Sequence, residues 1–205
     1  ESRGLGDVYK RQAGGLLRTP EGLLYVMLCD GMGSGPAAGR ESKLAVRLLE
    51  QFLRAGVQAE TALKTLNAAL ALRSEEEGGF TTVDLLELDL FTGAAALYKY
   101  GAAPTYLRRG TSVSRVTGAA LPAGLTDGER TTPDVTRLRL EAGDTVVLVS
   151  DGVADGREDQ WLRDALAAFD GESPKDLARE LVAAGTDEAG PRDDRTALVV
   201  RLSAR

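Results

Sequence analysis

An apolar segment that ends in an aspartate, followed at once by a run of glycines, constrains this chain more than any other part of it. Residues 23–29 are apolar, Asp30 follows, and residues 31–35 read Gly-Met-Gly-Ser-Gly. A short apolar run of this kind is typical of a buried strand, and glycines leave room around the side chain that precedes them. The pattern predicts a strand that fixes one carboxylate at its end.

Aspartates stand at the ends of two further predicted strands. A second apolar run, residues 145–149, leads to Asp151, and Asp193 and Asp194 stand just before the last apolar run, residues 197–200. Carboxylate oxygens are the ligands that Mg²⁺ and Mn²⁺ prefer, and carboxylates held together repel one another unless a cation is bound. Two such ions can lower the pKa of a shared water, which then attacks phosphorus. The sequence therefore predicts a hard-metal site.

Several other kinds of catalysis are excluded because the sequence lacks the residues that they require. It contains no histidine, which excludes Ser-His-Asp and Cys-His catalysis, imidazole zinc sites and histidine phosphorelay. The single cysteine, Cys29, lies in an apolar run, and a cysteine phosphatase loop would need an arginine where Gly35 stands. We interpret Cys29 as a packing residue. Residues 39–42 read Gly-Arg-Glu-Ser, so the glycine loop is not a Walker A loop.

Composition bounds the class of protein. The chain has 205 residues, 43% of them apolar, and no linker-like segment, so we expect one globular domain. A net charge of -6 without Lys and Arg clusters argues against a nucleic-acid or anionic-membrane surface. Residues 1–12 have neither a signal-peptide core nor periodicity. We expect them to be a non-native leader and residues 13–205 to form the domain, truncated at its N-terminus.

Hydrophobic periodicity divides the domain into helices and strands. Helices are predicted over residues 41–55 and 59–73, around residues 161–169, and after Pro174. Strands are expected at residues 23–29, 80–90, 94–100, 105–109, 112–116, 135–140, 145–149 and 196–202. Two helices, a run of strands, two helices and a closing strand indicate an α+β fold with helices outside a sheet core.

Six short motifs occur in order along the chain. They are DGMGSG at residues 30–35, TTVD at 81–84, GAAP at 101–104, LPAG at 121–124, SDGV at 150–153 and DDRT at 193–196. Together they resemble the PPM/PP2C-type serine/threonine phosphatases, and within these the catalytic domain of the stage II sporulation protein E group. The resemblance spans about residues 22–202. It implies an αββα sandwich, two antiparallel sheets flanked by pairs of helices, and metal-dependent hydrolysis of phosphoserine.

The resemblance also implies the roles of individual residues. Two Mn²⁺ or Mg²⁺ ions would lie between the sheets, with Asp30 bridging them and the carbonyl of Gly31 as a ligand. Asp151 and Asp193 would complete the catalytic set of protein ligands. Relatives often have Asn where Asp194 stands, so either Asp193 or Asp194 would bind metal.

The resemblance carries expectations about partners and context. The substrate it implies is a phosphorylated anti-sigma-factor antagonist protein, in the regulation of sporulation sigma factors. A homodimer is compatible with it. The family has one more acidic ligand before the first Asp-Gly motif, and the candidate here is Asp7, inside the expected leader. Members also carry N-terminal membrane and regulatory regions, so we expect a cytoplasmic domain tethered through regions beyond this sequence and without direct membrane contact of its own.

Two other function classes stay open. A catalytically inactive relative would keep the fold and bind a partner without metal-dependent turnover. A nucleotide-binding regulatory module would show protection of the glycine loop, residues 31–39, by ATP. Hydrolysis of a generic phosphate ester with and without Mn²⁺ separates these classes from a phosphatase.

Overall fold

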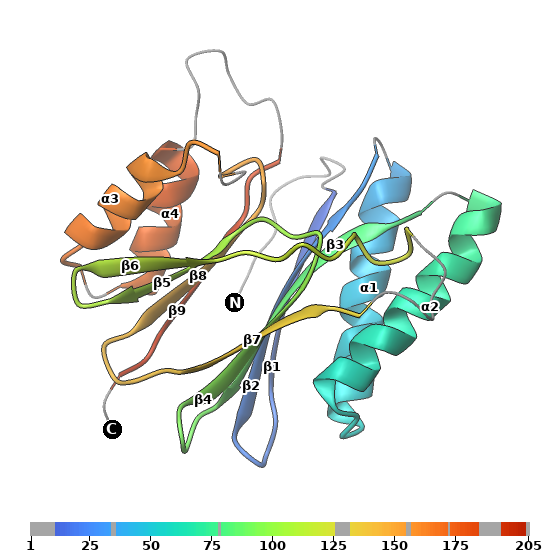
Figure 1. Cartoon of the computed structure of the whole chain (residues 1–205), viewed down its shortest axis with the longest axis horizontal. Coiled ribbons are helices and arrows are strands. Elements are labelled where there is room, and N and C mark those ends of the chain that lie inside the picture. Colours follow the sequence, from blue (N-terminus) through green and yellow to red (C-terminus); the bar gives the residue numbers. More distant parts are fainter. Residues whose placement is uncertain are drawn as a thin grey trace.

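The chain forms four layers, with two stacked antiparallel sheets in the middle and a pair of helices on each outer face (Figure 1). This computed structural model describes residues 11–33, 36–77, 79–125, 132–154, 157–171, 173–184 and 194–203. The predicted α+β class and the αββα arrangement are confirmed. Within the described residues, no helix is long and apolar enough to cross a membrane.

The strands divide into a five-stranded and a four-stranded sheet. The first has the order β1 (Gln12–Arg18), β2 (Leu23–Gly31), β3 (Thr81–Asp89), β4 (Ala94–Tyr100) and β7 (Asp134–Arg139). The second has the order β6 (Ser112–Val116), β5 (Thr105–Arg109), β8 (Thr145–Val149) and β9 (Ala197–Arg201). Each of these neighbouring pairs is antiparallel, with hairpin turns at the predicted places after β3 and β5.

The helices cover the outer faces of the sheets. The first pair is α1 (Pro36–Arg54) and α2 (Ala59–Glu77), which pack on the five-stranded sheet. The second pair, α3 (Gln160–Ala168) and α4 (Pro174–Ala184), packs on the four-stranded sheet. Gly56 ends α1 with a positive φ of 79°, and the amides of Gly56 and Val57 bond to the carbonyls of Leu53 and Phe52. This is the helix stop that the sequence predicts.

Strand β2 is apolar along its length because both of its faces are covered. Successive side chains of a strand point to opposite faces. Met27 and Cys29 belong to the core beneath α1 and α2, whereas Val26 and Leu28 belong to the core between the two sheets. The continuous run follows from this double burial, and the predicted packing role of Cys29 is consistent with its 0% exposure.

Two helix boundaries differ from the prediction. Helix α1 begins at Pro36 rather than residue 41, since proline is favoured in the first turn of a helix. Helix α2 continues to Glu77, whereas the sequence predicted an end before residue 74. The acidic run there indicated a loop, but glutamate is a good helix former.

Strand β1 was not predicted, because Gly14 and Gly15 interrupt its apolar pattern. A Cβ atom at Gly15 would lie 2.8 Å from the Val46 side chain, so the glycine allows α1 to pack closely on this strand. Gln12, the last residue of the predicted leader, is the first residue of β1 and pairs with Asp30. Residues 1–10, with the candidate ligand Asp7, lie outside the described residues.

Candidate metal centre

Two predicted site residues from different sheets meet where β2 and β8 end. Asp30 is the last residue but one of β2, and Asp151 is the second residue after β8, which ends at Val149. Both line one small cavity of about 40 Å³, together with Ser150 and Met32. Asp30 is buried, whereas Asp151 is exposed to solvent. The two strands therefore deliver one inner and one outer carboxylate to the same place.

Asp194 is joined to Asp30 through β1. The amide of Gln12 donates from Nε2 to Oδ2 of Asp30 at 2.9 Å and to the backbone carbonyl of Asp194 at 2.8 Å. The backbone N–H of Arg11 donates to Oδ2 of Asp194 at 2.9 Å. The edge strand β1 and the residue before it thus hold Asp194, in the segment that leads into β9, against the end of β2. Asp193, the other member of this predicted pair, lies outside the described residues.

Ser150 fixes the end of β8 relative to the segment that enters β9. Its hydroxyl accepts a hydrogen bond from the Thr196 amide at 3.0 Å and donates to the Asp194 carbonyl at 3.4 Å. Its own amide donates to the Thr196 carbonyl at 3.0 Å. These bonds hold Ser150, the residue before Asp151, against the segment that contains Asp194.

The surroundings of Asp30 disfavour the charged form of its carboxylate. Burial raises its pKa, and the carboxylates of Asp151 and Asp194 act in the same direction, while the Gln12 hydrogen bond and the charge of Arg11 oppose them. Oδ2 receives the Gln12 bond, but the buried Oδ1 has no hydrogen-bond partner among the described residues. A buried anionic oxygen without a donor is costly, and a bound cation would satisfy it.

Gly31 has to be a glycine because α1 begins directly above it. A Cβ atom at Gly31 would lie 1.9 Å from the carbonyl oxygen of Ala38. On the other side, the Thr81 hydroxyl donates to the Asp30 carbonyl at 2.9 Å, and the Asp30 amide donates to the Thr82 hydroxyl at 3.2 Å. Helix and strand therefore fix the Asp30 backbone from both sides.

The donor set suits a hard divalent cation. Asp30, Asp151 and Asp194 supply only oxygen atoms, and the charges of Asp151 and Asp194 help to raise the pKa of Asp30, as expected where carboxylates lie close enough to share an ion. In the part of the chain that the structure describes, no three acidic or sulfur side chains are close enough to form a complete site. Asp193 and Asp7, the two further predicted ligands, lie outside that part.

Gln12 is the site residue that sequence reasoning missed. It falls within the segment interpreted as a leader. Leu16 and Leu17, followed by the turn residues 19–22 and the strand from Leu23, do carry a hairpin signal. That hairpin, extended in register, places Gln12 opposite Asp30.

The sequence has relatives among sporulation proteins. Residues 20–203 match the family model described as stage II sporulation protein E (SpoIIE). Stage II sporulation protein E of Bacillus subtilis (strain 168) is 31% identical over 182 residues, which cover 85% of this chain and 22% of that protein. Its counterpart in Priestia megaterium is 28% identical over 204 residues, which cover 96% of this chain and 34% of that protein. The chain thus spans between about a fifth and about a third of the length of these relatives.

Solved structures share the fold. The PP2C phosphatase domain of SpoIIE from Bacillus subtilis, with a fragment of its regulatory domain, has a TM-score of 0.85 at 29% identity, covering 95% of this chain and 58% of that one. The same phosphatase domain in a crystal form without domain swapping has a TM-score of 0.71 at 27% identity, covering 98% and 88%. RsbX in complex with magnesium has a TM-score of 0.73 at 16% identity, covering 93% and 86%, and this likeness shows the fold alone.

Proposed function

Because the chain belongs to the stage II sporulation protein E family, whose catalytic domains are PP2C-type phosphatases, we propose that it hydrolyses phosphoserine on a protein in a metal-dependent reaction. One observation carries the proposal: Asp30 and Asp151, from two different sheets, line one cavity, and the buried Oδ1 of Asp30 has no partner among the described residues. A bound divalent cation would stabilise this buried, negatively charged oxygen.

The ligands of this site are proposed as follows. Asp30 would hold two Mn²⁺ or Mg²⁺ ions, with the carbonyl of Gly31, Asp151, and Asp193 or Asp194 as the further ligands. When bound, such ions supply activated water and neutralise the charge of the phosphoryl oxygens. Without them, carboxylates at the same place would repel a phosphate group.

The protein's own residues orient the acids. Gln12 donates to Oδ2 of Asp30, and Oδ1 has no donor among the residues that the structure describes, so this oxygen is available to a ligand. Ser150 ties the end of β8 to the segment before β9, which sets Asp151 relative to Asp194. Asp151 is exposed, and a phosphoserine side chain on another protein can approach it from solvent.

The substrate class that we infer is a phosphorylated anti-sigma-factor antagonist. Its support is the family relation together with the sporulation proteins that match this chain. The domain would act in the cytoplasm and would be tethered to a membrane through N-terminal regions. The relatives, of which this chain covers 22% and 34%, are long enough to contain such regions. A phosphoserine-bearing antagonist domain, offered alongside a phosphotyrosine peptide, tests this step, and equal rates on both would contradict it.

The phosphatase activity itself is tested with p-nitrophenyl phosphate. We expect hydrolysis with Mn²⁺ or Mg²⁺ and none with a chelator. A folded protein that binds Mn²⁺ but shows no turnover on either ester or phosphoprotein would identify an inactive, partner-binding relative. Protection of residues 31–39 by ATP, without hydrolysis, would instead identify a nucleotide-binding module.

A further inference from the structure

A fully buried ion pair lies between the two sheets. Lys99 of β4 and Asp84 of β3 have side chains that are 2% and 1% exposed, and Nζ of Lys99 is 2.8 Å from Oδ2 of Asp84. The same Nζ donates to the hydroxyl of Thr105 at 2.8 Å and to the carbonyl of Ala103 at 2.7 Å. An ammonium group has three N–H donors, so these acceptors use all of them. The pair therefore joins the five-stranded sheet to the start of β5 in the other sheet.

Strand register places this pair directly behind the candidate metal centre. Asp84 pairs with Leu28, two residues before Asp30, and residues two apart on a strand share a face. In the other sheet, Thr105 pairs with Leu148, three residues before Asp151. The pair thus stands between the apolar core of the sandwich and the two acids, and it contacts both sheets at that level.

The pair also borders the cavity at the site. Asp84 lines the same cavity of about 40 Å³ as Asp30 and Asp151, and its Oδ1 is buried without a hydrogen-bond partner among the described residues. Ala103, whose carbonyl Lys99 holds, lines the cavity as well. Any movement of the pair would therefore move the cavity wall.

Stability alone is a weak reason for such a pair. Removing two charges from water is costly, and apolar side chains of similar volume can replace a buried ion pair with little loss of stability. The directional bonds of Lys99 do what an apolar contact cannot, because they fix the two sheets at one separation. We propose that Asp84 and Lys99 are positioning residues that set the separation of Asp30 and Asp151, so that both carboxylates reach one metal centre. The inference rests on the proposed function.

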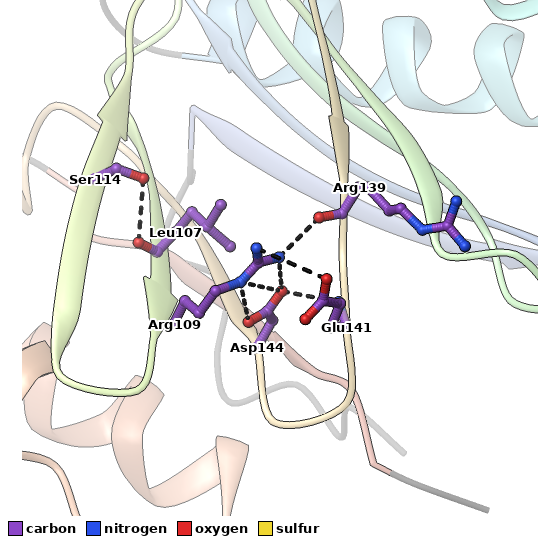
Figure 2. Close-up of polar contacts among 6 residues, drawn as sticks. All are labelled: Leu107, Arg109, Ser114, Arg139, Glu141 and Asp144. Atoms are coloured by element: carbon purple, nitrogen blue, oxygen red, sulfur yellow. Dashed lines mark hydrogen bonds and ion pairs between the residues drawn. The ribbon is translucent and has the colours of Figure 1, made fainter.

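The test removes the pair without leaving a lone charge. The double variant carries Asp84→Leu and Lys99→Met. Its control is Arg109→Met with Asp144→Leu, which removes a second ion pair at the other end of β5 (Figure 2). There, Arg109 donates to Asp144 at 2.6 Å and to the Arg139 carbonyl at 2.8 Å, so this pair also connects the two sheets, but away from the site.

Mn²⁺ binding by calorimetry and urea unfolding of the metal-free protein are measured for each variant. We expect the Asp84/Lys99 double variant to bind Mn²⁺ about 10-fold more weakly or worse, the size seen when groups that orient metal ligands are lost. The Mn²⁺ concentration that half-saturates p-nitrophenyl phosphate hydrolysis should rise in parallel. The control variant should unfold more easily, with Mn²⁺ affinity within about 2-fold of the wild type.

The measured Mn²⁺ affinities distinguish a positioning role of the Asp84–Lys99 pair from a role in packing alone. Wild-type Mn²⁺ affinity in the folded Asp84/Lys99 double variant overturns the inference, since the pair then serves packing only. If that variant does not fold, Asp84→Asn keeps the shape and an acceptor for Lys99, and unchanged Mn²⁺ affinity there overturns the inference equally. A wild-type protein that binds no Mn²⁺ overturns the proposed function along with it, whereas normal wild-type binding beside unaffected variants overturns the inference alone.

Discussion

The side-chain amide of Gln12 donates a 2.9 Å hydrogen bond to the carboxylate of Asp30 on the neighbouring strand. The bond occupies one oxygen of Asp30 and leaves the other, which is buried, without a partner among the described residues. The first residue of the edge strand β1 therefore determines which oxygen of the Asp30 carboxylate is left for a ligand.

Substitution of Gln12 by leucine removes this bond while keeping a side chain of similar size. We expect Mn²⁺ affinity, measured by calorimetry, to fall by about 10- to 100-fold, because the orientation of Asp30 is lost. The control is Gln160→Leu, which removes a 2.8 Å bond to Asp164 on the exposed face of α3. Equal Mn²⁺ affinities in the two variants would show that the Gln12 bond does not orient a metal ligand.

The contact between Gly31 and α1 predicts a second effect. In Gly31→Ala the new Cβ would lie 1.9 Å from the Ala38 carbonyl, so the start of α1 must move. We expect the free energy of unfolding in urea to fall by about 1 to 3 kcal/mol, the usual cost of overpacking. In Gly14→Ala, the matched change on β1, the Cβ would meet Leu198 at an ordinary 3.5 Å, and no comparable loss is expected. Equal stabilities would contradict the close approach of α1.

Cys29 is predicted to be a packing residue without a chemical role. It is fully buried, and burial raises the pKa of its thiol well above the ordinary range, so little thiolate forms near neutral pH. Alkylating reagents should react slowly with the folded protein and leave activity intact. Cys29→Ala should cost about 1 kcal/mol in urea unfolding, similar to the loss of one buried methylene. A Cys29→Ala protein that folds and binds Mn²⁺ yet has no turnover would point to covalent chemistry.

The Arg109–Asp144 pair predicts a pH-dependent stability (Figure 2). The hydrogen bonds from Arg109 lower the pKa of Asp144 from its ordinary value of 3.8. The folded state therefore binds fewer protons than the unfolded state, and the stabilisation is present above 3.8 and lost as pH falls through the lower, folded value. Asp144→Asn should lower the free energy of unfolding near neutral pH by about 1 kcal/mol or less, because the half-exposed Arg109 side chain is screened by solvent.

At about pH 3, below the ordinary value of 3.8, the difference between wild type and Asp144→Asn should shrink, because the carboxyl is then largely protonated in the unfolded state and folding must release that proton. Urea titrations at the two pH values measure it. A difference that stays the same at both would mean that the pair acts through packing rather than charge.

The two strands that precede Asp30 and Asp151 could be predicted from the sequence because burial on both faces makes each of them a continuous apolar run. β2 is covered on both faces, so residues 23–29 are apolar, and the run breaks at Asp30, where the strand reaches the cavity of the candidate metal centre. β8 is fully buried in the same way before Asp151. In these two places local pattern and tertiary position agree.

Other parts of the site depend on contacts that local pattern does not carry. β1 was missed because its glycines fit beneath α1, and Gln12 was missed with it. The sequence predicted no ion pair between Asp84, the last residue of the TTVD motif, and Lys99, and the burial of the two side chains follows from the way the second sheet stacks against them at Thr105. Such contacts join residues far apart in the sequence, so hydrophobic periodicity cannot reveal them.

The most direct measurement of the central claim is the rate of phosphoserine-peptide hydrolysis against Mn²⁺ concentration for wild type, Asp30→Asn and Asp151→Asn. We expect a saturable, chelator-sensitive rate for the wild type and a loss of more than about 100-fold in both variants, since each removes a charged ligand. In urea unfolding without metal, both variants should be at least as stable as the wild type. Each substitution removes one of two carboxylate charges, that of Asp30 or that of Asp151, which repel each other in the folded state. Wild-type turnover of either variant at saturating Mn²⁺ would contradict the assignment of this metal centre.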